Sequence, residues 1–255
     1  MNQFTGKVVV ITGAGDGMGR DAALTFAREG AKVVVAGRTE SKIDKVVGEI
    51  KAAGGVAIPV LADVRMAGQV EAMMKRAVGE WGRIDILYNN AGVGSNGKPL
   101  AEIDEAFFDD QVSINIKGVF LCMKYGILEM LKTGGGIIVN NASAAGLVAW
   151  RNASVYAGTK HAVVGMTKTA SIEYGMSGIR INCVCPCTHM TAMSERYKAR
   201  FTPEEWEVKV KWDHPSLGRP GRVEELTAVV MFLASDAASN IHGAAIPVDG
   251  GYTAQ

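Results

Sequence analysis

Short apolar segments rich in valine and isoleucine alternate along the chain with longer segments whose apolar residues recur every three or four positions. The first kind is typical of β-strands, and the second of helices with one buried face. Because the short runs are continuously apolar, they predict a parallel sheet that is covered on both sides. The expected strands are 7–11, 31–36, 56–60, 84–88, 136–140, 180–184 and 244–248.

Seven strand segments separated by six helical stretches predict a doubly wound α/β fold. No low-complexity linker or long internal repeat interrupts the sequence, so we expect residues 1–255 to form a single domain. Residues 188–221 depart from the alternation, because this stretch is long and mixed in composition. We expect it to form a substrate-binding lid with one or two short helices.

A glycine-rich turn, T-G-A-G-D-G-M-G at residues 12–19, connects the first strand to the first helix. Glycines let a backbone approach a ligand closely, and a helix N-terminus attracts phosphate. A glycine run alone is weak evidence, but its place between a strand and a helix is the context that dinucleotide binding requires. The predicted pyrophosphate-binding residues are Gly13, Asp16, Gly17, Met18 and Gly19.

Tyr156 and Lys160 are four residues apart, so they share one face of a predicted helix. A tyrosine with its ordinary pKa near 10 is a poor acid–base group, and a neighbouring ammonium lowers that pKa toward neutrality. Ser143, thirteen residues upstream, is placed to hydrogen-bond a substrate oxygen. A Tyr–Lys pair alone is usually a solvated pair, and Ser143 alone is usually a strand-end cap, so their joint occurrence carries the interpretation.

The chain resembles the classical short-chain dehydrogenases/reductases along its whole length. The T-G-x-x-x-G-x-G turn is followed in order by N-N-A-G at residues 89–92, Ser143, Y-x-x-x-K at 156–160, and a proline and threonine after the sixth strand. The resemblance implies a Rossmann-type sheet of seven mainly parallel strands in the order 3-2-1-4-5-6-7, with helices on both faces. It also implies hydride transfer between a nicotinamide cofactor and a secondary alcohol or ketone.

The resemblance also assigns roles to individual residues. Tyr156 becomes the general acid/base, Lys160 lowers its pKa and holds the nicotinamide ribose, Ser143 orients the substrate, and Asn115 supports a water-linked proton path. Asp63 contacts the adenine, although an aspartate at that position is also a common helix N-cap. The further expected cofactor contacts are Val64, Asn90, Ala91, Gly92, Pro186, His189 and Thr191.

The end of the second strand bears on the choice of nucleotide. Gly37-Arg38 stands where an acidic residue would bind the adenosine ribose and repel a 2′-phosphate. Arginine binds phosphate well, so NADP(H) is favoured, with Lys42 adding positive charge, and NAD(H) is the alternative. Asp16 argues mildly against the 2′-phosphate, and Arg38 stacked on adenine or facing solvent is the other interpretation.

The predicted substrate pocket is mostly apolar and is formed by Ser143, Ala145, Trp150, Tyr156, Met190 and Met193. It suggests a neutral hydrophobic or alicyclic alcohol or ketone. The alternatives are a 3-oxoacyl thioester reductase, a halohydrin-lyase-like enzyme, and a non-catalytic nucleotide-binding sensor or scaffold. Halohydrin-lyase-like enzymes and non-catalytic sensors or scaffolds usually lack the cofactor glycines, the tyrosine or the lysine. Their presence here argues against both alternatives, since the chain has Gly13, Gly17, Gly19 and Lys160.

The formal net charge of +1 gives no sign of a nucleic-acid or polybasic membrane surface. No leader and no long apolar run is seen, so we expect a cytoplasmic protein. Cys187 and His189 stand where the family usually has a glycine and an aliphatic residue. The cysteines lack the spacing of a zinc site, so we expect buried thiols and no metal. We also expect a homo-oligomer, a tetramer or dimer, built through apolar surface on 107–131 and 155–173.

Overall fold

Seven strands form one sheet in the computed structural model, which describes residues 2–255 without the side chain of Met193. The strands are β1 (Val8–Thr12), β2 (Lys32–Gly37), β3 (Val56–Leu61), β4 (Ile86–Asn89), β5 (Gly136–Asn141), β6 (Ile179–Pro186) and β7 (Ala245–Val248). They are all parallel and follow the order β3-β2-β1-β4-β5-β6-β7. The predicted fold class and strand order are confirmed.

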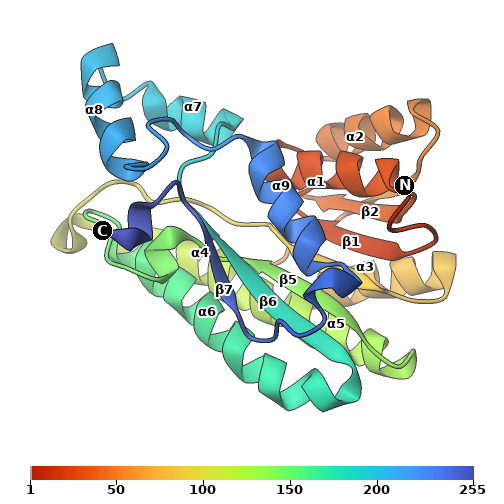
Figure 1. Cartoon of the computed structure of the whole chain (residues 1–255). Coiled ribbons are helices and arrows are strands. Elements are labelled where there is room, and N and C mark those ends of the chain that lie inside the picture. The colour runs from red at the N-terminus through yellow and green to blue at the C-terminus, as the bar shows by residue number, and fades with distance from the viewer. Residues whose placement is uncertain (1) are drawn as a thin grey trace.

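Helices cover both faces of this sheet (Figure 1). The helices are α1 (Gly17–Arg28), α2 (Glu40–Ala52), α3 (Ala67–Trp81), α4 (Glu105–Gln111), α5 (Gly118–Lys132), α6 (Ser154–Tyr174), α7 (Ala192–Lys198), α8 (Pro203–Asp213) and α9 (Val223–Leu233). α1, α2 and α9 pack on one face, and α3, α5 and α6 pack on the other, so the core has two layers. Every residue of β1 is buried, as its apolar sequence predicts, and every residue of β6 is buried as well, including the polar Arg180 and Asn182.

The edge strand β3 differs from the expectation that all strands are buried on both faces. Val56 and Leu61 at its two ends are exposed, because β3 has a neighbouring strand, β2, on one side only. The carboxyl ends of β1 and β4 lie at the point where strand order reverses, and open parallel sheets bind ligands in the crevice at that point.

Two of the connections between strands contain more than one α-helix. A π-helical turn, Val112–Lys117, joins α4 to α5, and Asn115 lies inside it. The mixed segment 188–221 contains α7 and α8, which stand apart from both helical layers (Figure 1). In residues 2–255, none of the helices combines the length and the apolar character needed to cross a bilayer.

Buried Arg180 in β6 fixes the end of α9. Its guanidinium donates to the carbonyl oxygen of Leu233, at the C-terminus of the helix, and to that of Ser235, which also accepts from the Ala238 N–H. α9 in turn packs along α1, the helix that follows the glycine-rich turn.

Replacing Arg180 with methionine should lower the free energy of unfolding by about 2 kcal/mol, because two buried carbonyls lose a charged donor. Urea unfolding monitored by circular dichroism measures this change. Arg28→Met, which removes an exposed guanidinium that bonds only Thr25, is the matched control and should shift stability by less than about 0.5 kcal/mol. Equal effects of the two substitutions would contradict the assignment.

Candidate active site

Two adjoining cavities open at the carboxyl ends of the strands. The larger has a volume of about 460 Å³ and extends from the glycine-rich turn to Tyr156, and the smaller, about 120 Å³, lies beside the ends of β2 and β3. Gly13 and residues 91–93 line both cavities, so together they form one elongated site. An extended ligand with two lobes fits this shape better than a compact one.

The glycine-rich turn depends on backbone conformations and contacts that side chains would prevent. Gly13 and Gly17 have φ angles of 64° and 52°, in the left-handed region. A Cβ atom at Gly19 would lie 2.3 Å from the carbonyl oxygen of Gly13 and 2.5 Å from Nδ2 of Asn90. The turn is therefore folded tightly enough to present the N-terminus of α1 to an anionic group, which fits a dinucleotide pyrophosphate.

Asn90 and Thr12 join this turn to the end of β4. Asn90 Nδ2 donates to the carbonyl oxygens of Thr12 and Gly13 at 3.1 and 3.2 Å. Thr12 Oγ1 accepts from the backbone N–H groups of Asn90 and Ala91, both at 3.1 Å. Asn90 thus holds the glycine-rich turn in place as well as lining the predicted nucleotide site. The sequence interpretation missed that Thr12 bonds the segment after β4, because a threonine at the end of a strand is common.

Asp16 serves as the N-cap of α1. Its carboxylate accepts from the Gly17 N–H at 2.8 Å and pairs with Lys42 Nζ at 2.8 Å. The hydrogen bond with Lys42 is the largest cause that holds the pKa of Asp16 below its ordinary value. Lys42 therefore neutralises the acidic side chain that the sequence placed in the phosphate loop.

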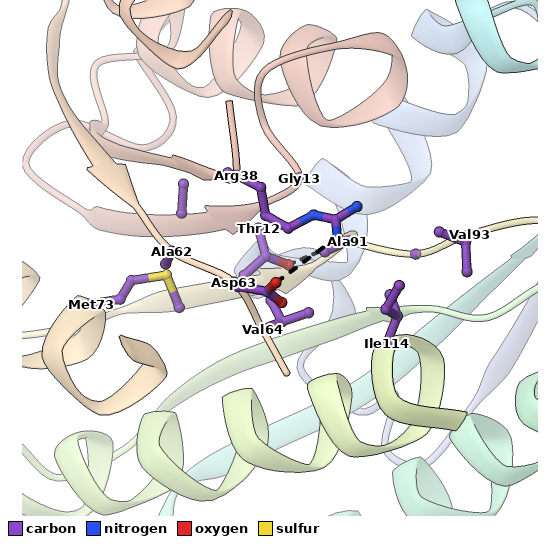
Figure 2. Close-up of a pocket in the computed structure, with 13 residues that line it drawn as sticks. Thr12, Gly13, Arg38, Ala62, Asp63, Val64, Met73, Ala91, Val93 and Ile114 are labelled. Atoms are coloured by element: carbon purple, nitrogen blue, oxygen red, sulfur yellow. Dashed lines mark hydrogen bonds and ion pairs between the residues drawn. The ribbon is translucent and has the colours of Figure 1, made fainter. Parts of the chain in front are cut away.

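The smaller cavity contains the residues expected around the adenosine. Arg38, Asp63 and Val64 line it, and Figure 2 shows the Arg38 side chain extending toward Asp63. Arg38 Nη1 lies 3.9 Å from the Asp63 carboxylate, which is held more tightly by Arg65 at 2.6 Å. The hydrogen bond with Arg65 lowers the pKa of Asp63, and Arg38 is half-exposed and free to turn toward another anion.

Three residues that the sequence singled out, Tyr156, Ser143 and Lys160, all line the larger cavity. Tyr156 and Lys160 belong to α6, as predicted, and Ser143 precedes the short turn at residues 144–146. Ser143 Oγ lies between the Ala145 N–H, from which it accepts at 3.1 Å, and the Pro186 carbonyl at 3.4 Å. Ser143 therefore caps a short turn, which is a common role for a serine at the end of a strand. Its hydroxyl also interacts with Tyr156. Lys160 Nζ is 5.7 Å from the centre of the Tyr156 ring.

The electrostatics of this group differ from the sequence expectation. Burial raises the pKa of Tyr156, and the opposing influence is its hydrogen bond with Ser143 rather than the ammonium of Lys160. Lys160 Nζ instead donates to the carbonyl oxygen of Asn141 at 2.8 Å, and burial lowers its own pKa to about 8. The lowering of the Tyr156 pKa by Lys160 that the resemblance implies stays a prediction.

Asn115 is completely buried and holds neighbouring segments together. Its side chain accepts from the Val93 N–H at 2.9 Å and donates to the Val93 carbonyl, Gln111 Oε1 and Thr159 Oγ1. None of these partners is Lys160, which follows Thr159 in α6. Asn115 therefore positions the wall formed by Val93, and the water-linked path through it stays a prediction.

The end of β6 and the segment after it close the cavity with Pro186, Cys187, His189 and Thr191. Burial raises the pKa of the Cys187 thiol to about 12 and lowers the pKa of His189, so both side chains are neutral at pH 7. All four cysteines are buried and free. Among residues 2–255 no cluster of three or more histidine, cysteine or acidic side chains is arranged to hold a metal ion.

Trp150 forms the wall at the Tyr156 end of the cavity. Its ring packs edge-on against Tyr156, at 6.5 Å between centroids, and against Tyr252 at 5.8 Å. Ser95 Oγ donates to the Asn152 carbonyl at 3.0 Å, which ties the loop after β4 to this wall, and Asn152 has a φ of 58°. No signal in the sequence brings Tyr252 to this place, because its contact with Trp150 joins distant segments.

Part of the predicted substrate pocket is placed differently. Ala145 is completely buried and does not line the cavity, because its backbone is folded under Ser143 in the short turn. Met190, whose N–H donates to the Gly221 carbonyl, does not line it either. The side chain of Met193 lies outside the described part of the chain. The polar side chains of Arg151, Asn152 and Arg196, which the sequence interpretation missed, do line it.

A lysine with a depressed pKa changes stability with pH in a definite direction. Between pH 8 and Lys160's ordinary pKa of 10.5, the unfolded chain holds a proton that the folded chain has released, so stability rises with pH in that window. The wild type should gain about 2 kcal/mol between pH 8 and pH 10 relative to Lys160→Met. Denaturant unfolding of both proteins across this range measures the difference, and parallel curves would contradict the low pKa.

The family model described as enoyl-(acyl carrier protein) reductase matches residues 13–253. Among curated proteins, the chain is 43% identical to meso-2,3-butanediol dehydrogenase of Serratia marcescens, covering 99% of this chain and 96% of that protein. It is 39% identical to cyclohexanol dehydrogenase of Acinetobacter sp. (strain SE19), covering 100% and 98%. These names describe oxidoreductases of alcohols.

Solved structures agree. The 3-ketoacyl-(acyl-carrier-protein) reductase from Brucella melitensis, complexed with NADH, is similar with a TM-score of 0.88 and 33% identity, covering 98% of this chain and 99% of that one. A putative NAD(P)-dependent gluconate 5-dehydrogenase from Beutenbergia cavernae, with bound NADP, has a TM-score of 0.92 and 32% identity, covering 100% and 99%. The chain therefore belongs to the classical short-chain dehydrogenase/reductase family and is a nicotinamide-dependent oxidoreductase that acts on CH–OH groups.

Proposed function

We propose that this protein interconverts a neutral, hydrophobic or alicyclic secondary alcohol and its ketone, with NADP(H) as the preferred cofactor. The observation that carries the proposal is the meeting of Tyr156, Ser143 and Lys160 in a cavity whose opposite end is the glycine-rich turn. A reacting carbon held beside Tyr156 then lies in the same cavity as the nucleotide site.

Tyr156 and Ser143 handle the substrate oxygen in this proposal. In reduction, the Tyr156 hydroxyl donates its proton to the carbonyl oxygen while Ser143 holds that oxygen in place, and in oxidation Tyr156 accepts the proton. The nicotinamide, when bound, supplies or accepts the hydride. Because burial raises the pKa of Tyr156, its hydroxyl is protonated at neutral pH and ready for the reductive direction.

Lys160 acts beside this pair. Its amine, tied to Asn141, lies within reach of the Gly92 backbone, since a Cβ placed on Gly92 would sit 3.6 Å from Nζ. It is therefore placed to donate to a ribose hydroxyl. Asn115, whose Oδ1 also lies beside Gly92, keeps Val93 and the cavity wall in position. We assign Asn115 as a positioning residue.

The substrate end supports a small, largely apolar ligand with room for a second polar group. Trp150, Ala153 and Cys187 provide apolar surface, and Ser95 and Asn152 provide hydrogen-bonding groups at its margin. A flat ring packs well against the Trp150 wall. The names of the butanediol and cyclohexanol dehydrogenase relatives agree with such substrates, and the 3-ketoacyl reductase neighbour keeps a thioester reductase as the alternative.

Preference for NADP(H) is supported by Arg38 and by the neutralisation of Asp16. Arg38 lines the smaller cavity with its guanidinium half-exposed, where it can bind two oxygens of a 2′-phosphate. The ion pair with Lys42 cancels the repulsion that Asp16 alone would exert on that phosphate. NAD(H) is the alternative.

We further propose that the chain acts as a homo-oligomer, a tetramer or dimer, with residues 188–221 as a lid. Phe108, Phe120, Leu128 and Leu131 on α4 and α5, and Ile172 on α6, are exposed apolar side chains on the segments expected to pair. Burying such a patch against a second copy removes it from water.

Tyr156→Phe should reduce kcat/KM for ketone reduction by at least about a thousandfold, because the substrate oxygen loses its proton donor. The dissociation constant of the reduced cofactor should stay within about twofold of the wild-type value. An unchanged dissociation constant shows that the substitution affects the chemical step and not cofactor binding. Tyr252→Phe keeps its contact with Trp150 and is the matched control, expected to retain activity. In the wild type, oxidation should speed up and reduction slow down as pH rises through the pKa of Tyr156. A Tyr156→Phe variant that remains active would contradict the proposal.

Arg38→Asp should weaken NADPH binding by about ten- to a hundredfold and leave NADH binding unchanged or tighter, because a charged donor to the 2′-phosphate becomes a repelling carboxylate. Energy transfer from tryptophan to bound dihydronicotinamide measures both constants. Lys45→Asp makes the same charge reversal on the exposed side of α2 and is the control. Tighter wild-type binding of NADH than of NADPH would overturn the NADP(H) preference and leave the reaction assignment intact.

A further inference from the structure

The larger cavity holds more positive than negative side chains. Its charged lining residues are Asp16, Lys42, Arg151, Lys160 and Arg196. Lys42 is paired with Asp16, and Lys160 is bound to the Asn141 carbonyl. In the part of the chain that the structure describes, Arg151 and Arg196 line the cavity without an ion pair or hydrogen bond. The two arginines lie on different segments, one beside Trp150 and one on α7.

Arg196 lies above the glycine-rich turn. The start of α7 packs against this turn, since a Cβ placed on Gly17 would sit 3.2 Å from Cγ2 of Thr191. Ala192 and Arg196, which are four residues apart and share one face of α7, both line the cavity. Arg196 lines the same cavity as Asp16 and Gly17 at the N-terminus of α1. Its positive charge is the smallest of the influences that lower the pKa of Asp16.

We propose that Arg196 binds the pyrophosphate of the nicotinamide dinucleotide from the lid side and thereby fastens α7 over the cofactor. This role rests on the cofactor of the proposed function. It adds a side-chain contact from segment 188–221 to a site otherwise formed by the glycine-rich turn.

Charge balance supports this role. A pyrophosphate brings two negative charges to the N-terminus of α1, where the carboxylate of Asp16 already stands and is paired with Lys42. The helix N-terminus provides only a partial positive charge. A planar guanidinium that can donate to two oxygens supplies the missing charge, and a phosphate is the ligand for which that geometry is suited.

Binding at Arg196 would also be transmitted through the lid. Tyr197, the next residue, packs against Phe201 and Trp206 with ring centroids 5.2 and 6.5 Å away, and Trp206 belongs to α8. A capping box between Thr191 and Ser194 makes the first turn of α7 regular. Fastening α7 therefore holds α8 in place as well, so nucleotide binding and lid order become coupled.

The test compares three glutamine variants that each remove one positive charge. Arg196→Gln should raise the dissociation constant of NADPH, or of NADH if that is the tighter ligand, about tenfold, measured by tryptophan energy transfer. ADP-ribose, which keeps the pyrophosphate and lacks the nicotinamide, should be weakened by the same factor in a displacement titration. Lys198→Gln on the opposite face of α7 and Arg151→Gln at the substrate end should both stay within about twofold.

Salt dependence gives a second readout. Binding to Arg196→Gln should weaken less steeply with increasing salt than binding to the wild type, because one charge pair has been removed. Unchanged dinucleotide and ADP-ribose affinity in Arg196→Gln, or an equal loss in Lys198→Gln, would overturn the inference while leaving the proposed function standing. A raised KM for the alcohol with unchanged nucleotide affinity would also overturn it, by assigning Arg196 to the substrate. A wild-type chain that binds neither dinucleotide would overturn the proposed function together with this inference.

Discussion

The close approach of the glycine-rich turn to the end of β4 is the constraint on which the rest of the site depends. Asn90 donates to two carbonyl oxygens of the turn, and Gly19 must lack a side chain for this contact to form. The contact joins β1 to β4 at the point where strand order reverses. It therefore sets the N-terminus of α1 and the wall at residues 91–93 relative to each other, and both cavities share that wall.

Burial is the largest influence on the pKa of both Tyr156 and Lys160. Tyr156 and Lys160 are removed from water by the same packing, so the tyrosine favours its neutral phenol and the lysine gives up its proton more easily. The carbonyl of Asn141 holds the amine in place and partly compensates for its desolvation. Burying the charged amine lowers the free energy of unfolding near neutral pH, and such a loss of stability is common at functional sites.

Segment 188–221, which we propose as a lid, differs from the sheet in how it is held. The strands are fixed by two buried apolar layers, whereas α7 and α8 are held by an aromatic cluster around Tyr197 and by caps at their first turns. Segments with few buried apolar contacts open at low free energy. The contact that we propose between Arg196 and the cofactor would add to these interactions in holding the segment over the cavity.

The sequence by itself determined the strands, the glycine-rich turn and the shared helix face of Tyr156 and Lys160. These features depend on local periodicity and backbone conformation, and the family resemblance supplied the strand order. Tertiary structure alone decided the direction of the Tyr156 pKa and the removal of Ala145 and Met190 from the cavity wall. It also brought Tyr252 against Trp150 and Arg196 over the turn, because burial and contacts between distant segments arise only when the whole chain has packed.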